Sequence, residues 1–326
     1  MDRIMLFTIM GMAIIMYLVI NTFLTEDWSH MDSVMLFHER KPARVVISMS
    51  TFARRLETTG LDIIRDLIKN QRYDRLIVTV SLVHRNSTGK CDRFVDCVSD
   101  DRVRPIHTVA QCLHIFDSAF GPFKALTPPR AHPSVLPYEN GKLYLQIMTT
   151  PDYGPATKLL GALIAEPDPH TVIVTVDDDV YYVRNYVSQL AHYMPRNGTL
   201  GSQFQYLDSG RTVAMILLPD IWRVFANGYG FRFEGWLMGV AGVAYRRSYF
   251  DDGIFREARQ LSRECFLNDD VWVCGYLRQR GIHPHLHLGV SSYGHRRHAT
   301  ESLSTIKGAQ QQDMVKCAKS YGFPFP

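Results

Sequence analysis

Three consecutive acids follow an apolar, β-branched stretch of the chain. Asp177, Asp178 and Asp179 come directly after residues 171–176, which read Thr-Val-Ile-Val-Thr-Val. Such a stretch is typical of a strand buried on both faces, and in open α/β folds ligands bind at the carboxyl edge of such strands. In an extended chain, Asp177 and Asp179 would point to one side and Asp178 to the other. Because neighbouring carboxylates repel one another unless a cation compensates them, the triplet indicates a metal-phosphate site; a solvated turn is the alternative.

A second acidic group stands before an apolar stretch near the C-terminal end. Asn268, Asp269 and Asp270 predict the start of a helix over residues 271–280, which Gly281 would stop. Helix capping needs only one of these side chains. A carboxylate is therefore left over that capping alone does not explain.

The elements that would position these acids alternate between strand and helix patterns. Residues 44–49 and 76–82 are apolar runs that predict strands, and residues 58–71 between them have apolar side chains at helical spacing. Residues 152–155 (Asp-Tyr-Gly-Pro) open a further helix that ends at residues 166–167, with Pro155 suited to its first turn. This order predicts an α/β fold with a mostly parallel sheet flanked by helices.

Two further segments stand out by composition. Residues 110–142 are rich in proline and other turn formers, which predicts a long loop within one domain rather than a domain boundary. Residues 231–245 are apolar and punctuated by glycine, so we expect their backbone to approach a ligand or another strand closely.

The N-terminal segment has the length and composition of a membrane span. Residues 4–24 are uncharged and overwhelmingly apolar, and roughly 20 such residues cross a bilayer as a helix. Arg3 before the span and Glu26 after it favour a cytosolic N-terminus and a lumenal or external body. We therefore predict a transmembrane signal anchor at residues 1–24, a short stem at 25–43 and one catalytic body at 44–326.

The overall composition is that of an ordinary globular protein. The 326 residues are 46% hydrophobic and 21% charged, with a formal net charge of +4 and no basic stretch that indicates nucleic-acid binding. None of the six cysteines forms a Cys-x-x-Cys pair, which argues against a zinc ribbon. Cys91 and Cys97 flank a short loop that would let them pair; unpaired buried thiols are the alternative. Asn86 and Asn197 match the glycosylation pattern and agree with a lumenal body.

Taken in order, these motifs resemble a known superfamily. The anchor, the strand–helix–strand start, the Asp-Tyr-Gly-Pro-x-x-Lys helix at residues 152–158, the Asp-x-Asp strand end and the Asn-Asp-Asp helix start are similar to those of nucleotide-sugar-dependent glycosyltransferases with the Rossmann-related GT-A fold. The resemblance covers roughly residues 43–298. It implies an enzyme that moves a sugar from a nucleotide-sugar donor to a hydroxyl of a glycan or glycoprotein, with inversion. It also implies Mn²⁺ (or Mg²⁺) as cofactor and a Golgi-like membrane location.

The resemblance further implies roles on the donor side. Asp179 would bind the metal directly, and Asp177 would bind it through water or contact the ribose. Asp178 would contact the residues that bind the cofactor, or it would face the core. Thr51 and Arg55, in the turn after the first strand, would hold the nucleotide.

Two basic side chains complete the implied donor site. Lys158 would lie near the nucleotide-sugar; an exposed helix lysine is the alternative. A histidine near the C-terminal end of the fold would be the third metal ligand, and among His287, His295 and His298 we favour His295 because Gly-His at 294–295 lies in a predicted turn.

On the acceptor side, the resemblance implies a general base at the start of the late helix. Asp270 is the first choice for the side chain that takes the proton from the acceptor hydroxyl, with Asp269 the second. Glu234 and Trp236 would border the acceptor pocket, because an aromatic face packs well on a sugar ring. The alternative for Trp236 is a place in the core.

Two other functions stay open. A sugar nucleotidyltransferase uses a related fold, but the anchor and the lack of a glycine-rich, basic N-terminal loop argue against it. A glycan-binding protein with a silent site is the non-enzyme alternative. The complete acid triplet and the candidate base argue against it.

Overall fold

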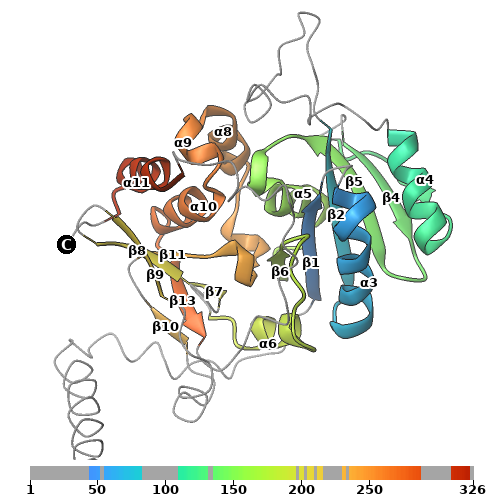
Figure 1. Cartoon of the computed structure of the whole chain (residues 1–326), viewed down its shortest axis with the longest axis horizontal. Helices are drawn as coiled ribbons and strands as arrows, with labels where there is room; N and C mark the ends of the chain where they lie inside the picture. Colours follow the sequence, from blue (N-terminus) through green and yellow to red (C-terminus); the bar gives the residue numbers. More distant parts are fainter. Residues whose placement is uncertain are drawn as a thin grey trace, which may run out of the picture. The chain divides into compact units, whose positions relative to one another are not determined.

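Figure 1 shows a computed structural model of the chain. The structure describes residues 44–51, 55–82, 109–130, 135–195, 198–201, 204–208, 211–215, 230–232, 235–287 and 310–323. The chain forms two compact units, residues 1–39 and 40–326, and every described residue belongs to the second. No helix within the described ranges has both the length and the apolar character needed to cross a membrane. The predicted anchor and the predicted stem lie outside those ranges.

The described part of the second unit is built around a large mixed sheet (Figure 1). Its ten described strands run in the order β10-β13-β7-β12-β6-β1-β2-β5-β4-β3, and the central four are parallel to one another. These four are β1 (Arg44–Thr51), β2 (Arg75–Leu82), β5 (Leu145–Pro151) and β6 (Thr171–Val176). The α/β class and the strands predicted at 44–49, 76–82 and 171–176 are thereby confirmed.

Shorter strands extend the sheet on both sides, mostly in antiparallel pairs. They are β3 (Lys124–Ala125), β4 (Leu136–Asn140), β7 (Gly198–Gly201), β10 (Gly230–Arg232), β12 (Val243–Arg246) and β13 (His283–His287). β12 is antiparallel to β6, and β13 is parallel to β7. A separate small sheet has the order β11-β8-β9, and its strands are β8 (Phe204–Asp208), β9 (Arg211–Met215) and β11 (Trp236–Leu237).

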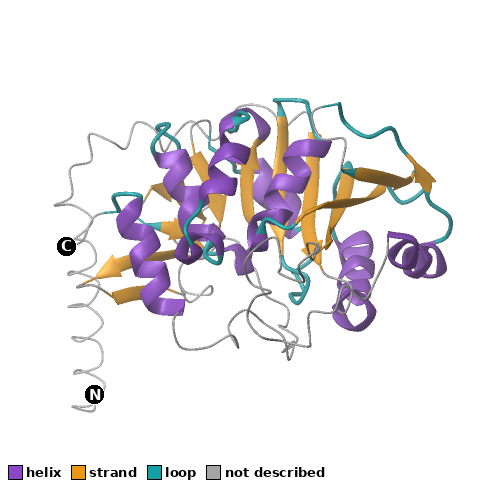
Figure 2. Cartoon of the chain, turned by 90° about the horizontal axis from the view of Figure 1, so that it is seen from above, coloured by secondary structure: helices purple, strands orange, loops and turns teal. Residues whose placement is uncertain are grey.

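Helices lie on both faces of the main sheet (Figure 2). The α-helices are α3 (Leu61–Asn70), α4 (Val109–Phe120), α5 (Thr157–Ala165), α6 (Tyr186–His192), α8 (Gly253–Gln260), α9 (Arg263–Phe266), α10 (Asp269–Arg278) and α11 (Gln310–Ser320). The shorter helical turns are the π-helix η2 (Leu56–Gly60) and the 3-10 turns η4 (Gly154–Ala156), η5 (Gly239–Ala241) and η6 (Arg247–Tyr249).

The alternation of side chains along the strands divides the core into two clusters. Val46, Ile77 and Ile173 face the cluster that α5, α8 and α10 cover, whereas Ile47 and Val174 face the cluster that α3, α4 and α6 cover. β6 is buried along its whole length, as a strand with two covered faces must be. This double cover leaves the strand ends as the accessible edge of the sheet.

The loop predicted for residues 110–142 is wrong. The first part is the helix α4, and the second part contributes β3 and β4. Cys112 and Phe116, one helical turn apart, are buried against the sheet, and this apolar face was hidden by the proline content of the residues that follow. Pro137 lies inside β4, where only the two residues of β3 pair on the outer side, so the missing N–H costs little.

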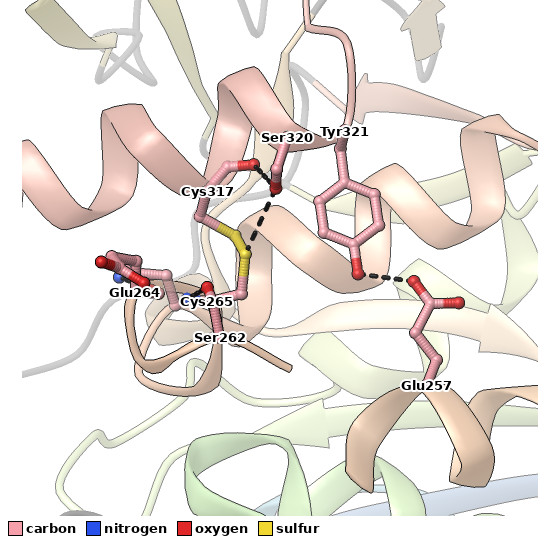
Figure 3. Close-up of a disulfide and its surroundings, with 8 residues drawn as sticks. Glu257, Ser262, Glu264, Cys265, Cys317, Ser320 and Tyr321 are labelled. Atoms are coloured by element: carbon pink, nitrogen blue, oxygen red, sulfur yellow. Dashed lines mark hydrogen bonds between the residues drawn. A yellow bond between two sulfur atoms is a disulfide. The ribbon is translucent and has the colours of Figure 1, made fainter. Parts of the chain in front are cut away.

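A disulfide joins Cys265 of α9 to Cys317 of α11, across 52 residues of sequence (Figure 3). The hydroxyl of Ser320 lies 3.6 Å from the sulfur of Cys265, and the hydroxyl of Tyr321 donates to Glu257 beside it. Sequence spacing did not predict this pair, because residues far apart in the chain meet only in the folded structure. The pair considered there, Cys91 and Cys97, lies outside the described residues.

Candidate functional site

The predicted acidic side chains gather at the carboxyl edge of the parallel strands. β6 ends at Val176, and the chain then turns at Asp178 and Asp179 instead of continuing as a strand. The alternation expected for an extended chain therefore does not apply. Asp177 stays 27% exposed at the side chain, whereas the other two acids are almost fully buried.

Asp178 lies in a pocket that we call the Arg55 pocket, formed by Thr51, Arg55, Asp178 and Asp179. The Thr51 hydroxyl donates to one Asp178 oxygen at 2.8 Å, and Nη1 of Arg55 donates to the other. Nη2 of Arg55 lies 3.7 Å from Asp179. Burial raises the pKa of Asp178 to about 6, although Arg55 and Thr51 both act to lower it. Thr51 and Arg55, predicted to hold a nucleotide, here hold the end of β6.

Lys158 connects the end of β6 to the start of α10. Its Nζ atom lies 2.7 Å from Asp177 and 3.5 Å from Asp269, and its side chain is only 9% exposed. We call the group formed by Lys158, Asp177, Asp269 and Asp270 the Lys158 junction. The alternative of an exposed helix lysine is wrong. Burial would lower the pKa of Lys158, but the three carboxylates together raise it well above its usual value.

The local sequence explains why Lys158 points into this edge. Pro155 lies in the first turn of η4, as predicted, and α5 follows directly at Thr157. The carbonyl oxygen of Lys158 accepts a hydrogen bond from the hydroxyl of Ser48 on β1, which fixes the first turn of α5 over the sheet. Gly154 has a φ of +62° and lies against Phe266, so the same turn also contacts α9.

Asp270 is the acid of the Lys158 junction whose titration is shifted furthest. Its carboxylate accepts a hydrogen bond from the backbone N–H of Gly239 in η5. Burial, and next the charge of Asp269, raise the pKa of Asp270 to about 8, against the opposing effect of Lys158. Burial also raises the pKa of Asp269. At neutral pH a carboxyl group with such a pKa exchanges protons readily, which is what a general acid–base group needs.

The start of α10 agrees only partly with the capping predicted from sequence. Asn268 occupies the N-cap position, but its side-chain amide donates to the carbonyl oxygen of Glu264 at 2.6 Å and does not cap the helix. Asp269 and Asp270 occupy the first turn, where the helix dipole favours negative charge. Both carboxylates lie near Lys158. This contact accounts for the carboxylate that capping alone did not explain.

Two residues of this edge were missed by sequence reasoning. The Tyr182 hydroxyl accepts from the backbone N–H of Asp177 at 3.0 Å and donates to the carbonyl oxygen of Val240 at 3.1 Å. It thereby joins the end of β6 to η5. Gly239 is the second of these residues. The glycines of segment 231–245 predicted a close approach of the backbone, but the pattern did not single out this glycine.

Of the two predicted acceptor residues, the structure describes Trp236 and does not bring it to this edge. Trp236 is fully buried, and its ring lies edge-on to Phe323 with centroids 5.4 Å apart. It therefore offers no free face to a sugar ring, and the core alternative holds. Glu234 and His295 lie outside the described residues.

The donor chemistry suits a hard divalent cation, because carboxylate oxygens are the ligands such ions prefer. Within the described ranges, however, no group of three or more His, Cys, Asp or Glu side chains is close enough together to hold a metal ion. Asp177 and Asp179 are directed to Lys158 and Arg55, respectively. The described residues thus supply ligands of the right type but not a completed ligand set.

No protein-family model matches the chain, and no curated protein is significantly similar to it in sequence. The function is therefore inferred from the residues of the site itself.

Proposed function

We propose that the chain is a metal-dependent glycosyltransferase of the GT-A type. It transfers a sugar from a nucleotide-sugar donor to a hydroxyl of a glycan or glycoprotein acceptor, with inversion at the sugar carbon. One observation carries this proposal. The acid at the end of β6 and the acids at the start of α10 lie about 90 residues apart in sequence, and they meet at Lys158.

This convergence supports a donor side and an acceptor side within one site. Asp177 at the strand end is the donor-side group, and Asp270 at the helix start is the base. In the transfer step the acceptor oxygen attacks the sugar carbon, the bond from that carbon to the diphosphate breaks, and the acceptor proton passes to Asp270. Lys158 keeps the two acidic segments together despite their repulsion.

Charge supports a cationic cofactor at this edge. Among the described residues of the Lys158 junction, three carboxylates share one ammonium group. Burial is the main reason that the pKa values of Asp269 and Asp270 are raised, and the neighbouring carboxylates raise them further. A bound Mn²⁺ or Mg²⁺ would neutralise the diphosphate leaving group as a Lewis acid. Asp177 and Asp179 are the described residues that we assign to hold it, with His295 as the proposed third ligand.

The disulfide supports a place for the body in an oxidising compartment. Pairs such as Cys265–Cys317 persist in secreted and lumenal proteins and are rare in the cytosol. With the apolar segment at residues 4–24, this favours a single-pass protein with a lumenal, Golgi-like catalytic body. Sugar attached to Asn86 or Asn197 in cells, detected by glycosidase treatment, would test the orientation.

The proposed activity is tested by measuring nucleoside-diphosphate release from a panel of nucleotide sugars. The purified 326-residue chain is assayed with Mn²⁺ or EDTA and a mixture of glycan acceptors, beside the variant Asp179→Ala. We expect turnover with one donor, abolished by EDTA and in the variant. The anomeric configuration of the product is then read by NMR, and retention would exclude Asp270 as a base for inversion.

Other outcomes identify the competing functions. Release of pyrophosphate in place of nucleoside diphosphate would identify a sugar nucleotidyltransferase. Metal-dependent binding of a nucleoside diphosphate by calorimetry, without turnover of any donor, would identify a binding protein. A matched control is Asp62→Ala, because Asp62 lies in the first turn of α3, on an exposed side chain that pairs with Arg65 at 3.2 Å.

A further inference from the structure

The backbone of η5 is fastened at two successive carbonyl groups. The Tyr182 hydroxyl donates to Val240, and the Tyr186 hydroxyl donates to Ala241. The two tyrosine rings stack on each other with centroids 5.5 Å apart, and both side chains are almost fully buried. Gly239 at the start of η5 is therefore on a backbone that cannot easily recede.

Gly239 lies against two members of the Lys158 junction, Asp270 and Lys158. A Cβ atom added to Gly239 would be 2.6 Å from Oδ1 of Asp270 and 2.8 Å from Nζ of Lys158. Both distances are too short for a real Cβ contact, so a side chain at this position would displace one group or the other. Because the displaced atoms are the ends of flexible side chains, they can move aside without a shift of the backbone.

The backbone N–H of Gly239 also donates to the carboxylate of Asp270. When Asp270 is ionised, this hydrogen bond is charge-assisted and therefore stronger than a hydrogen bond between neutral groups. Gly239 thus supplies a backbone N–H donor to Asp270 and, because it has no side chain, leaves room for the carboxylate beside Lys158.

We infer that Gly239 is a positioning residue for Asp270, holding the carboxylate beside Lys158 through its N–H and through the space that its missing side chain leaves. This inference rests on the proposed function, in which Asp270 is the base. The glycine-punctuated segment 231–245 predicted a close approach of the backbone, and Gly239 is the position where that approach involves Asp270 and Lys158.

Gly239→Ala tests the inference in the 326-residue chain, with Gly141→Ala as the matched control. A Cβ at Gly141 would meet nothing within 4 Å. We expect Gly239→Ala to lower kcat by about 100-fold, since a misplacement of about 1 Å can cost that much. The donor KM and the affinity for nucleoside diphosphate should stay within about twofold, and Tm should fall by less than about 4 °C.

A large fall in kcat with little change in KM and Tm distinguishes a positioning role of Gly239 from a structural one. A kcat within twofold of the wild type would overturn the inference. So would a larger fall in Tm, because Gly239 would then be needed for folding rather than for Asp270. Gly141→Ala should behave as the wild type in every measurement.

A second measurement does not depend on turnover. In protein labelled with ¹⁵N at glycine, the resonance missing from Gly239→Ala identifies Gly239, and we expect Asp270→Ala to move that amide proton upfield. Asp251→Ala should move Gly253, whose N–H donates to Asp251 at 2.6 Å, and should leave Gly239 in place. If the chemical shift of the Gly239 amide proton is unchanged in Asp270→Ala, the inference is overturned even if the enzyme is active. A shifted amide in a chain with no turnover would uphold the contact and reject the proposed function.

Discussion

The Arg55 pocket and the Lys158 junction lie at the same edge of the sheet but balance their charges differently. In the Arg55 pocket, Asp178 is 3% exposed and takes one hydrogen bond at each oxygen, from Thr51 and from Arg55. In the described residues of the Lys158 junction, one ammonium group faces three carboxylates. Asp178 therefore has a donor at each of its oxygens, although it shares Arg55 with Asp179, whereas the three acids of the junction compete for one ammonium group.

This difference separates an acid that holds the fold from acids that are available for chemistry. A buried carboxylate with two donors is locked, and its pKa rises only to about 6. Asp270, with the Gly239 N–H and a shared lysine, has a pKa of about 8. Surplus negative charge at an accessible edge can be relieved by binding a proton or a cation. We therefore place the chemistry at the Lys158 junction and a supporting role at the Arg55 pocket.

The largest expected effect is loss of transfer activity in Asp270→Asn. The amide keeps the shape of the side chain but cannot take a proton, so kcat should fall by about 10²–10⁴-fold, the usual contribution of a general base. Asp178→Asn should cost less, because Asp178 is assigned a supporting role. Steady-state kinetics with the donor found in the panel measures both variants.

The order of these two effects is what the comparison depends on. A larger loss for Asp178→Asn than for Asp270→Asn would reverse the roles of the Arg55 pocket and the Lys158 junction. Asp62→Asn on α3 should leave kcat unchanged.

The second effect in size is on stability and follows from removing the shared cation. Lys158→Met would leave the carboxylates of the junction buried without their ammonium partner, and breaking a buried pair in this way costs about 3–5 kcal/mol. We expect the loss to be greatest near pH 8 and smaller near pH 5, where the carboxyl groups of the junction can take up protons. Urea unfolding at both pH values measures it.

The matched control for this variant is Lys69→Met, which removes an exposed lysine from the last turn of α3. It should change the free energy of unfolding by only tenths of a kcal/mol. An equal effect of the two substitutions at pH 8 would show that Lys158 does not hold the junction together.

The smallest expected effect is a pH dependence that distinguishes the two regions. A carboxyl group whose pKa is raised in the folded state stabilises the fold below the pKa of the unfolded chain, and this contribution is lost as the pH rises through the folded pKa. Asn cannot ionise, so the Tm of Asp270→Asn relative to wild type should rise with pH from about 4, the ordinary pKa of an Asp, and level off above about 8. The same rise for Asp178→Asn should already level off near pH 6.

Thermal unfolding between pH 4 and pH 9 checks this prediction. Each kcal/mol of difference corresponds to about 2–4 °C in a protein of this size. A relative Tm that levels off at the same pH in both variants would mean that the pocket and the junction are electrostatically alike.

The predictions from sequence that were wrong or left open depended mostly on contacts between residues that are far apart in the chain. α4 was missed because the prolines that follow it dominated the composition, although the spacing of Cys112 and Phe116 is helical. Trp236 was open between core and acceptor pocket because only the fold reveals that Phe323, 87 residues later in number, packs on it. The pairing of Cys265 with Cys317 was beyond sequence spacing for the same reason.

The sequence by itself determined the local elements and the types of groups at their ends. Apolar runs such as residues 171–176 determine a buried strand, and Pro155 determines the first turn of a helix, because both depend on neighbours along the chain. Tertiary structure alone decided which charges are compensated. Whether Arg55 meets Asp178, and whether Lys158 lies between Asp177 and Asp269, depends on how distant strands and helices pack, because Coulomb energies depend on distances in space and on burial.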